Sequence, residues 1–302
     1  MSHGADSIKT IFFALGANLA IACAKLAAAA LTSSGAMFAE AIHSLADTGN
    51  QVLLLIGLRR ARLPPTPEHP LGYGKAIYFW SFLVALILFS IGGLVSIYEG
   101  LHKLAHPEPL RAPLIAVGVL VFSLAAEAVS MWGCLREVNK VRGARSLWRW
   151  FRESRQSELL VVFAEDGAAL FGLTLALAAV LLTLVTGDPR CDAIGTLGIG
   201  ALLVAIAIFV GIEIKALLIG QGVDVTVDAE MRAFLRARPE VVELFNLLTL
   251  QLGDRVMVAV KARMAPYPSA DALIAAINVV EAAFRERFPD VLWLFFEPDN
   301  AD

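Results

Sequence analysis

A histidine and an aspartate lie four residues apart within an otherwise apolar segment. His43 and Asp47 share one face of a helix, one turn apart, because residues at i and i+4 lie on the same side. An imidazole and a carboxylate at this separation can both bind one divalent cation. Asn50 and Gln51 continue that face one turn further on. The same His–Asp pair can instead hydrogen-bond internally and stabilise a bundle, so the spacing alone leaves both interpretations open.

A second apolar segment carries two adjacent acids, Glu165 and Asp166. Adjacent helical residues point about 100° apart, so we expect only one of them to face a site squarely. Neither segment contains an internal lysine or arginine. Carboxylates without a counter-charge in a membrane repel each other, and a divalent cation or a proton is their natural partner. We therefore predict a metal site formed by His43, Asp47, Glu165 and Asp166.

Two more charged residues, Lys25 and Glu127, fall in the middle of apolar segments. An ionisable side chain inside a membrane helix costs at least about 2.5–3.5 kcal/mol on insertion scales, so each needs an explanation. We expect the two to neutralise each other, with a proton relay as the alternative.

The elements that carry these residues are transmembrane helices. Of the 302 residues, 58% are hydrophobic and only 18% are charged, and the mean hydropathy is +0.69. A membrane-spanning helix needs about 20 apolar residues, and six segments meet this requirement. They are residues 8–30, 36–58, 76–100, 113–137, 158–186 and 192–219. The first lacks a basic start and a cleavage site, so we interpret it as a retained helix and not as a signal peptide.

Composition also excludes several classes of protein. It rules out disorder, a collagenous repeat and most soluble folds. The net charge of −3 and the pI near 6.0 give no basic stripe for nucleic acid. The three cysteines contain no CxxC pair, so neither a disulfide framework nor a thiolate zinc site is expected.

Basic residues in the loops predict the orientation. Short cytoplasmic loops carry an excess of Lys and Arg. Here that excess lies in the loops after the second and fourth segments, at Arg59, Arg60, Arg62, Lys75, Arg136, Lys140, Arg142, Arg145, Arg149, Arg152 and Arg155. We therefore expect both termini in the cytoplasm. The compactness of the chain and the absence of a targeting segment favour a membrane of the bacterial inner-membrane type. The second basic loop, with its two tryptophans, is expected to lie along anionic lipid headgroups.

From about Val223 the composition changes, which divides the chain into a membrane domain (1–221) and a cytoplasmic domain (222–302). The pattern predicts an amphipathic helix over 228–238, strands over 245–252 and 256–264, a helix from the capping residue Ser269 to about 288, and a strand over 291–296. A Gly253–Asp254 turn joins the first two strands. The order αββαβ indicates a small α+β domain.

Two motifs give the chain a family resemblance. The segment HSLADTGNQ, residues 43–51, lies in the second helix, and HPLGYGK, residues 69–75, precedes the third. Together with six helices, acids in the fifth helix and an αββαβ tail, these motifs resemble the cation diffusion facilitator family of divalent-metal transporters. The resemblance covers essentially the whole chain.

The resemblance implies a homodimeric secondary transporter that exports Zn²⁺ or a related ion by proton antiport, with a ferredoxin-like cytoplasmic domain. It implies a tetrahedral transport site with His43 and Asp47 on the second helix and Asp166 on the fifth. The remaining position of the family pattern falls on Val162, which has no donor atom. Glu165, an asparagine (Asn18 or Asn50) or a water molecule is left to complete the shell.

The chain departs from the family in two further places. No His or Cys occurs from Val223 onward, so a regulatory zinc site is not expected there. Weak carboxylate sites remain conceivable at Asp224, Asp228, Glu297 and Asp299, but we expect this domain mainly to dimerise. His69 matches a family metal position, yet its partner four residues on is Tyr73, which favours a structural role in the turn.

The resulting hypothesis is Zn²⁺ export by alternating access. Metal binding requires deprotonated ligands, so protons and metal compete for one site. Imidazole titrates within the cellular pH range and favours Zn²⁺ over Mn²⁺. The substrates are thus a divalent metal and protons, with no prosthetic group. Transport of Mn²⁺, Co²⁺, Fe²⁺ or Cd²⁺ is an alternative, as is a non-transporting metal sensor or scaffold. An intramembrane hydrolase lacks its HExxH or GxSxG motif, so we expect no enzyme.

Overall fold

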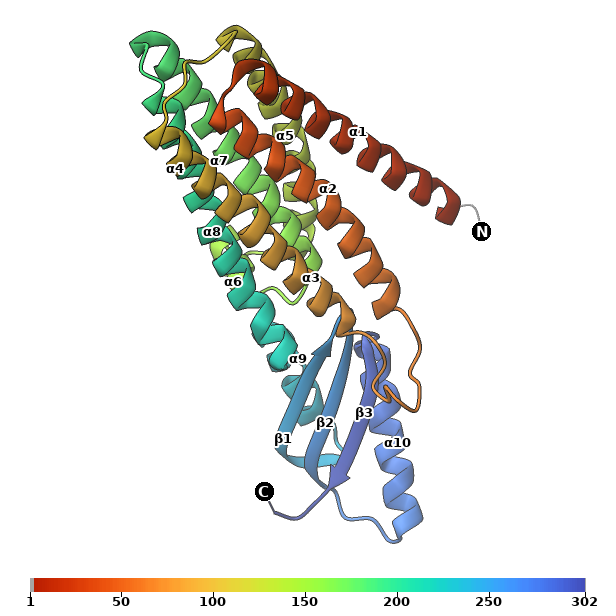
Figure 1. Cartoon of the computed structure of the whole chain (residues 1–302). Coiled ribbons are helices and arrows are strands. Elements are labelled where there is room, and N and C mark those ends of the chain that lie inside the picture. The colour runs from red at the N-terminus through yellow and green to blue at the C-terminus, as the bar shows by residue number, and fades with distance from the viewer. Residues whose placement is uncertain (1–2, 302) are drawn as a thin grey trace. The chain divides into compact units, whose positions relative to one another are not determined.

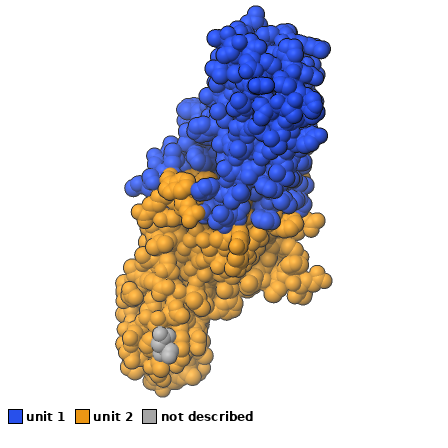
Figure 2. Space-filling model, turned by 60° about the vertical axis from the view of Figure 1, so that its left-hand side comes forward, with its two compact units in different colours: residues 1–56, 80–147, 158–213 blue, residues 57–79, 148–157, 214–302 orange. Residues whose placement is uncertain are grey.

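The structure is a computed structural model that describes the backbone of residues 3–301 and the side chains of residues 18–301. The chain forms two compact units, coloured separately in Figure 2. Unit 1 comprises residues 1–56, 80–147 and 158–213. Unit 2 comprises residues 57–79, 148–157 and 214–302. The predicted metal-site residues all belong to unit 1.

Long helices build most of unit 1, and the ends of some of them belong to unit 2 (Figure 1). They are α1 (His3–Thr32), α2 (Gly35–Ala61), α3 (Ala76–Ile87) continued by a π-helical turn η1 (Leu88–Leu94) and α4 (Val95–Ala105), α5 (Pro113–Val141), α7 (Ser157–Thr186) and α8 (Arg190–Ile219). The predicted helical bundle is thereby confirmed. The short helix α6 (Leu147–Glu153), within the basic loop, was not expected from the sequence.

Four of these segments are long and apolar enough to cross a membrane, within the part of the chain that was searched. They are Ala76–Ala105, Pro113–Val141, Ser157–Thr186 and Arg190–Ile219. α2 is not among them, because its polar residues lower its hydropathy. In α1 the apolar stretch with described side chains is shorter, Asn18–Thr32.

Glycines bring η1 and α4 close to α8. A Cβ atom on Gly93, in η1, would lie 2.6 Å from Cγ2 of Val204, and one on Gly200 would lie 2.8 Å from the backbone nitrogen of Ile97. Small residues let helix backbones approach closely in membranes, where no hydrophobic effect drives the helices together. The π-helical turn thus lies at a tight helix–helix contact.

A buried aspartate at the start of α8 holds the start of α2. Asp192 is 2% exposed, and its carboxylate accepts hydrogen bonds from the Ser34 hydroxyl at 2.5 Å and the Gly35 amide at 2.6 Å. The ammonium of Lys103, on α4, lies 3.8 Å from the same carboxylate. A helix N-terminus has unsatisfied N–H groups and favours negative charge. One carboxylate therefore joins three helices and fixes the start of α2.

The C-terminal part of unit 2 has the predicted order of helices and strands. It comprises α9 (Val225–Arg236), β1 (Val241–Leu252), β2 (Arg255–Met264), α10 (Ala270–Arg287) and β3 (Val291–Pro298). The sheet order is β1-β2-β3, with β1 and β2 antiparallel and β2 and β3 parallel. Gly253 has φ +70° in the hairpin turn, and the Ser269 hydroxyl accepts a hydrogen bond from the Ala272 amide. The predicted α+β domain is confirmed.

One face of this sheet packs against both helices. Val258 and Val260, two residues apart on β2, share a core with Leu235 of α9 and Phe284 of α10. Alternate residues of a strand point to the same face, so this packing leaves the intervening residues on the other side.

The opposite face of the sheet is apolar and open. Leu248, Ala259 and Phe295 are register partners across the three strands. Leu248 is 61% exposed and Phe295 is 52% exposed. We call this row of three residues the open sheet face.

The Asp192 contacts predict a stability effect. Asp192→Ala removes the acceptor of the Ser34 and Gly35 hydrogen bonds and leaves Lys103 without its anion. We expect a loss of about 2 kcal/mol or more, which is within the range of charged hydrogen bonds and helix caps. Tryptophan fluorescence of the detergent-solubilised protein on heating measures the melting midpoint. Glu108→Ala, at an exposed loop acid, is the control, and equal midpoints for the two variants would contradict the assigned role.

Candidate metal centre

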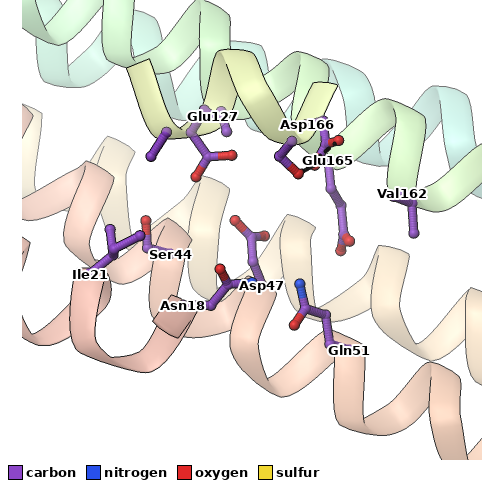
Figure 3. A pocket seen from close by; sticks show the side chains of 12 residues that line it. Asn18, Ile21, Ser44, Asp47, Gln51, Glu127, Val162, Glu165 and Asp166 are labelled. Atoms are coloured by element: carbon purple, nitrogen blue, oxygen red, sulfur yellow. Dashed lines mark hydrogen bonds between the residues drawn. The ribbon is translucent and has the colours of Figure 1, made fainter. Parts of the chain in front are cut away.

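A cavity of about 80 Å³ lies between α1, α2, α5 and α7 in unit 1 (Figure 3). Its polar lining comprises the carboxylates of Asp47, Glu127, Glu165 and Asp166, the amides of Asn18 and Gln51, and the hydroxyls of Ser44 and Ser130. One buried water molecule requires roughly 10–15 Å³ of such a cavity volume, so the cavity has room for an ion together with several water molecules. The folded helices thus bring acids from three elements to one space.

α2 presents its polar face to this cavity. Ser44, Asp47 and Gln51 line the cavity, as their spacing on one helix face requires. His43 is fully buried, and its Nε2 lies 3.5 Å from Oδ2 of Asp47. Neither ring nitrogen of His43 has a hydrogen-bond partner among the described residues. Because an unpartnered buried polar group costs free energy, a metal ion bound at Asp47 would satisfy this imidazole.

Both acids of α7 are among the residues that line the cavity. The amide Nδ2 of Asn50 donates a hydrogen bond to Oε1 of Glu165 at 2.6 Å. The Ser130 hydroxyl donates to the Asp166 carboxylate at 3.2 Å. These donors come from α2 and α5, the helices that line the cavity with α7. Figure 3 shows the side chains of Glu165 and Asp166 at this cavity.

Val162 lies one turn before Asp166 and also lines the cavity. The position that the family pattern assigns to a ligand therefore does face this space, but it contributes only methyl groups. Oxygen atoms from other residues are the donors available on this side.

Glu127 is a cavity residue that the sequence analysis did not assign to the metal site. It projects from α5 toward α2 (Figure 3), and it lines the cavity together with Ser130 one turn further along. The available signal was an acid in the middle of an apolar segment with serines on either side. That signal led us to expect a charge pair with Lys25 and not a place beside Asp47.

The partner of Lys25 in the structure is Glu40, which corrects the expected pairing with Glu127. The Lys25 ammonium lies 3.5 Å from Oε2 of Glu40 and donates a hydrogen bond to the Ser44 hydroxyl at 2.6 Å. α1 and α2 form a helical hairpin with its turn at Ser33. Position 25 of such a hairpin therefore lies level with the stretch between positions 40 and 44.

The acids line the cavity without closing on a single point. Among the described residues, no group of three or more His, Cys, Asp or Glu side chains is close enough to hold a metal ion as it stands. A cation that enters has to draw the acids inward or keep part of its water shell.

Acids of the C-terminal domain have structural partners. Asp224 caps α9 by accepting a hydrogen bond from the Thr226 amide at 2.8 Å. Asp228 pairs with Arg232 at 2.6 Å. The backbone amide of Asn300, and then Lys261 at 3.2 Å, lower the pKa of Asp299 below its ordinary value.

His69 has an aromatic contact in unit 2. Its ring stacks on that of Tyr73 with centroids 4.3 Å apart, and its backbone amide donates to the carbonyl of Thr66 at 3.0 Å. These contacts favour the structural role in the turn that precedes α3.

Comparison with known proteins gives a consistent result. The family model of the cation efflux transmembrane domain matches residues 11–219. The chain is 34% identical over 231 residues to the mitochondrial proton-coupled zinc antiporter SLC30A9 of Xenopus laevis, an alignment that covers 76% of this chain and 41% of the relative.

Two other relatives come from a plant and a bacterium. Metal tolerance protein C4 of Arabidopsis thaliana is 30% identical over 249 residues, covering 82% of this chain and 54% of the relative. Zinc transporter ZitB of Escherichia coli (strain K12) is 22% identical over 274 residues, covering 90% and 82%. The chain thus spans about two fifths of the length of the first relative and about half that of the second. The match to a transmembrane domain, with the four long apolar helices, identifies an integral membrane protein.

Proposed function

The chain belongs to the cation efflux family, and from this premise we propose that it is a secondary transporter that exports divalent metal cations in exchange for protons. The observation that carries the proposal is the cavity among apolar helices with four carboxylates in its lining. Charge is costly at membrane depth, and a divalent cation offsets several carboxylates at once. Two of the relatives above are named as zinc transporters, which supports the same conclusion.

We assign His43, Asp47, Asp166 and Glu165 as the metal-binding residues. Asp47 and Asp166 line the cavity from α2 and α7, and His43 lies beside Asp47 with unsatisfied nitrogens. Glu165 supplies oxygen on the side where Val162 supplies none. Its Oε2 remains available when Oε1 accepts the Asn50 hydrogen bond.

Proton antiport follows from the chemistry of these ligands. Imidazole and carboxylate bind metal only when they are deprotonated, so metal entering from one side releases protons, and protons entering from the other side release the metal. Alternating access of the cavity to the two sides turns this competition into export.

Zn²⁺ is the proposed cargo because the site combines an imidazole with carboxylates. Imidazole nitrogen favours Zn²⁺, whereas oxygen-only sites suit Mg²⁺ or Mn²⁺. We place both termini in the cytoplasm, in accord with the basic loops after α2 and α5. We also place the protein in a bacterial inner membrane.

Liposomes that contain the purified protein test the transport proposal. With an acidic interior, we expect uptake of external Zn²⁺ that ends when a proton ionophore collapses the gradient. Asp47→Ala and Asp166→Ala should reduce uptake to the rate of protein-free liposomes, because each removes a cavity carboxylate. A zinc-sensitive dye inside the vesicles measures the initial rate.

Glu108→Ala, at an exposed acid outside the cavity, is the transport control and should retain the wild-type rate. Wild-type flux in both cavity variants would exclude the proposed site. Zinc binding by the wild type without any flux would instead support a sensor or scaffold.

Val162 offers a gain-of-function test. Val162→His places an imidazole in the cavity one turn from Asp166. We expect the affinity for Zn²⁺ to rise by about tenfold or more, since even outer-shell partners change metal affinity by that factor. Titration calorimetry on detergent-solubilised protein measures the change, with Val162→Leu as the control. Equal affinities for the two variants would place this side of the cavity outside the metal site.

We further propose that the protein is a homodimer that uses the open sheet face of the C-terminal domain. Leu248, Ala259 and Phe295 form a continuous apolar row with two large exposed side chains. Contiguous exposed apolar surface favours a protein contact, and association of two copies removes it from water.

Aspartate substitutions test the dimer. Leu248→Asp and Phe295→Asp should each raise the dimer dissociation constant by about tenfold or more, as charges in the centre of an apolar interface do. Light scattering on the eluting, detergent-solubilised protein reports the mass. Ile274→Asp, at an exposed apolar position on α10, is the matched control, and dimers of unchanged strength in both face variants would disprove this interface.

A further inference from the structure

Lys25 is an ammonium group sealed among apolar helices. The whole residue is 0% exposed, and so is its ion-pair partner Glu40. Lys25 Nζ lies 3.5 Å from Oε2 of Glu40 and 2.6 Å from the Ser44 oxygen. Burying both members of an ion pair carries a large desolvation penalty, and neutral residues of similar size are often no less stable. Stability alone therefore does not explain why a charged pair occupies this place.

The position of Glu40 is restricted by α7. A Cβ atom on Gly172 would lie 2.2 Å from Oε1 of Glu40, so the glutamate carboxylate packs directly on the backbone of that helix. Glu40 is thus held in place from two sides, by Gly172 and by Lys25. Of the two charged partners, the lysine has the longer and more flexible side chain.

Lys25 lies at the edge of the metal cavity. Its hydrogen-bond acceptor Ser44 lines the cavity, one helical turn along α2 from Glu40 and three residues before Asp47. The carboxylates of Asp47 and Glu127 line the same cavity as Ser44. A lysine side chain that turned past Ser44 would therefore exchange Glu40 for the carboxylates that line the cavity.

We propose that Lys25 is a tethered cation that competes with the transported metal for the carboxylates of the cavity. It moves toward Asp47 and Glu127 when the cavity holds no cation and is returned to Glu40 when a metal ion enters. This inference rests on the proposed function, because it treats the cavity as the metal site. Like charges repel strongly in a medium of low dielectric constant, so the ammonium and a divalent cation exclude each other there.

The competition has a consequence for release of the metal. A lysine that takes the place of the departing cation keeps the acids from being left without a counter-charge. Glu40 then determines how strongly the Lys25 ammonium competes with the metal ion. When Glu40 holds Lys25 more tightly, the competition is weaker and the metal ion binds more tightly.

The two residues of the pair therefore predict opposite effects. Lys25→Met removes the competitor and should tighten Zn²⁺ binding, whereas Glu40→Gln frees the ammonium and should weaken it. Each change should be about tenfold or more, at the lower end of the effect of one charge on a carboxylate a few ångströms away. The double variant Lys25→Met/Glu40→Gln should bind Zn²⁺ more tightly than the wild type, because the competing ammonium is absent from it.

Calorimetric titration of the full-length, detergent-solubilised protein with ZnCl₂ at fixed pH measures these affinities. Size-exclusion chromatography establishes that each variant is folded. If a single variant does not fold, the double variant provides the test, since it replaces the ion pair by neutral residues. Lys140→Met is the matched control: this exposed lysine pairs with Glu137 and does not line the cavity, so its loss should leave the affinity unchanged.

The inference is overturned if Lys25→Met and Glu40→Gln change the affinity in the same direction or leave it unchanged, as a purely structural ion pair would. It is also overturned if the double variant binds Zn²⁺ no more tightly than the wild type, as expected of two fixed charges whose effects cancel. Failure of the proposed function gives a different result, namely no Zn²⁺ binding by the wild type or equal binding by the wild type and Asp47→Ala.

Discussion

Each charge inside the apolar helices of unit 1 requires a partner, and this constraint determines how the unit is built. Lys25 lies against Glu40, and Asp192 lies against the start of α2 and Lys103. Among the described residues, the buried side-chain atoms without a hydrogen bond fall almost entirely on α2, at Glu40, His43, Asp47 and Asn50, with Ser123 on α5 as the exception. The polar contacts of the bundle are therefore least complete along α2, the helix that contributes Asp47 to the cavity.

The contacts away from the cavity serve to keep α2 in place. Asp192 fixes the first turn of this helix, and Asn50 ties its middle to Glu165 on α7. The segment formed by η1 and α4 packs on α8 through Gly93 and Gly200, where any larger side chain would separate the helices. Metal ligands keep their geometry only when the helices that carry them are held rigidly. Asp192 at the start of α8 holds α2 and therefore influences the site, although it lies far along the chain from His43.

The sequence alone predicted the helices, caps and turns that depend on residues close together in the chain. Apolar length identified the long helices, and the capping residue Ser269 and the turn at Gly253 placed the α+β domain, because caps and turns depend on a few neighbouring residues. The candidate site was predictable in part: His43 and Asp47 follow from i,i+4 spacing. Glu127 and the Lys25–Glu40 pair did not follow, because these contacts depend on how far one helix is displaced along another, which no periodicity encodes. The approach of both Glu165 and Asp166 to one cavity required the donors on α2 and α5.

The donors around the cavity are distributed unevenly, and this bears on ion preference. The lining from α5 and α7 offers only oxygen, from Glu127, Glu165, Asp166 and a serine, while Val162 offers none. The imidazole of His43 is buried behind Asp47. In the proposed transporter a cation therefore meets oxygen first, and oxygen alone distinguishes poorly among Zn²⁺, Co²⁺ and Mn²⁺. Selectivity for Zn²⁺ therefore has to come from the step in which the ion draws Asp47 and His43 together around itself. That step depends on how far α2 can move between its fixed contacts at Asp192 and Asn50.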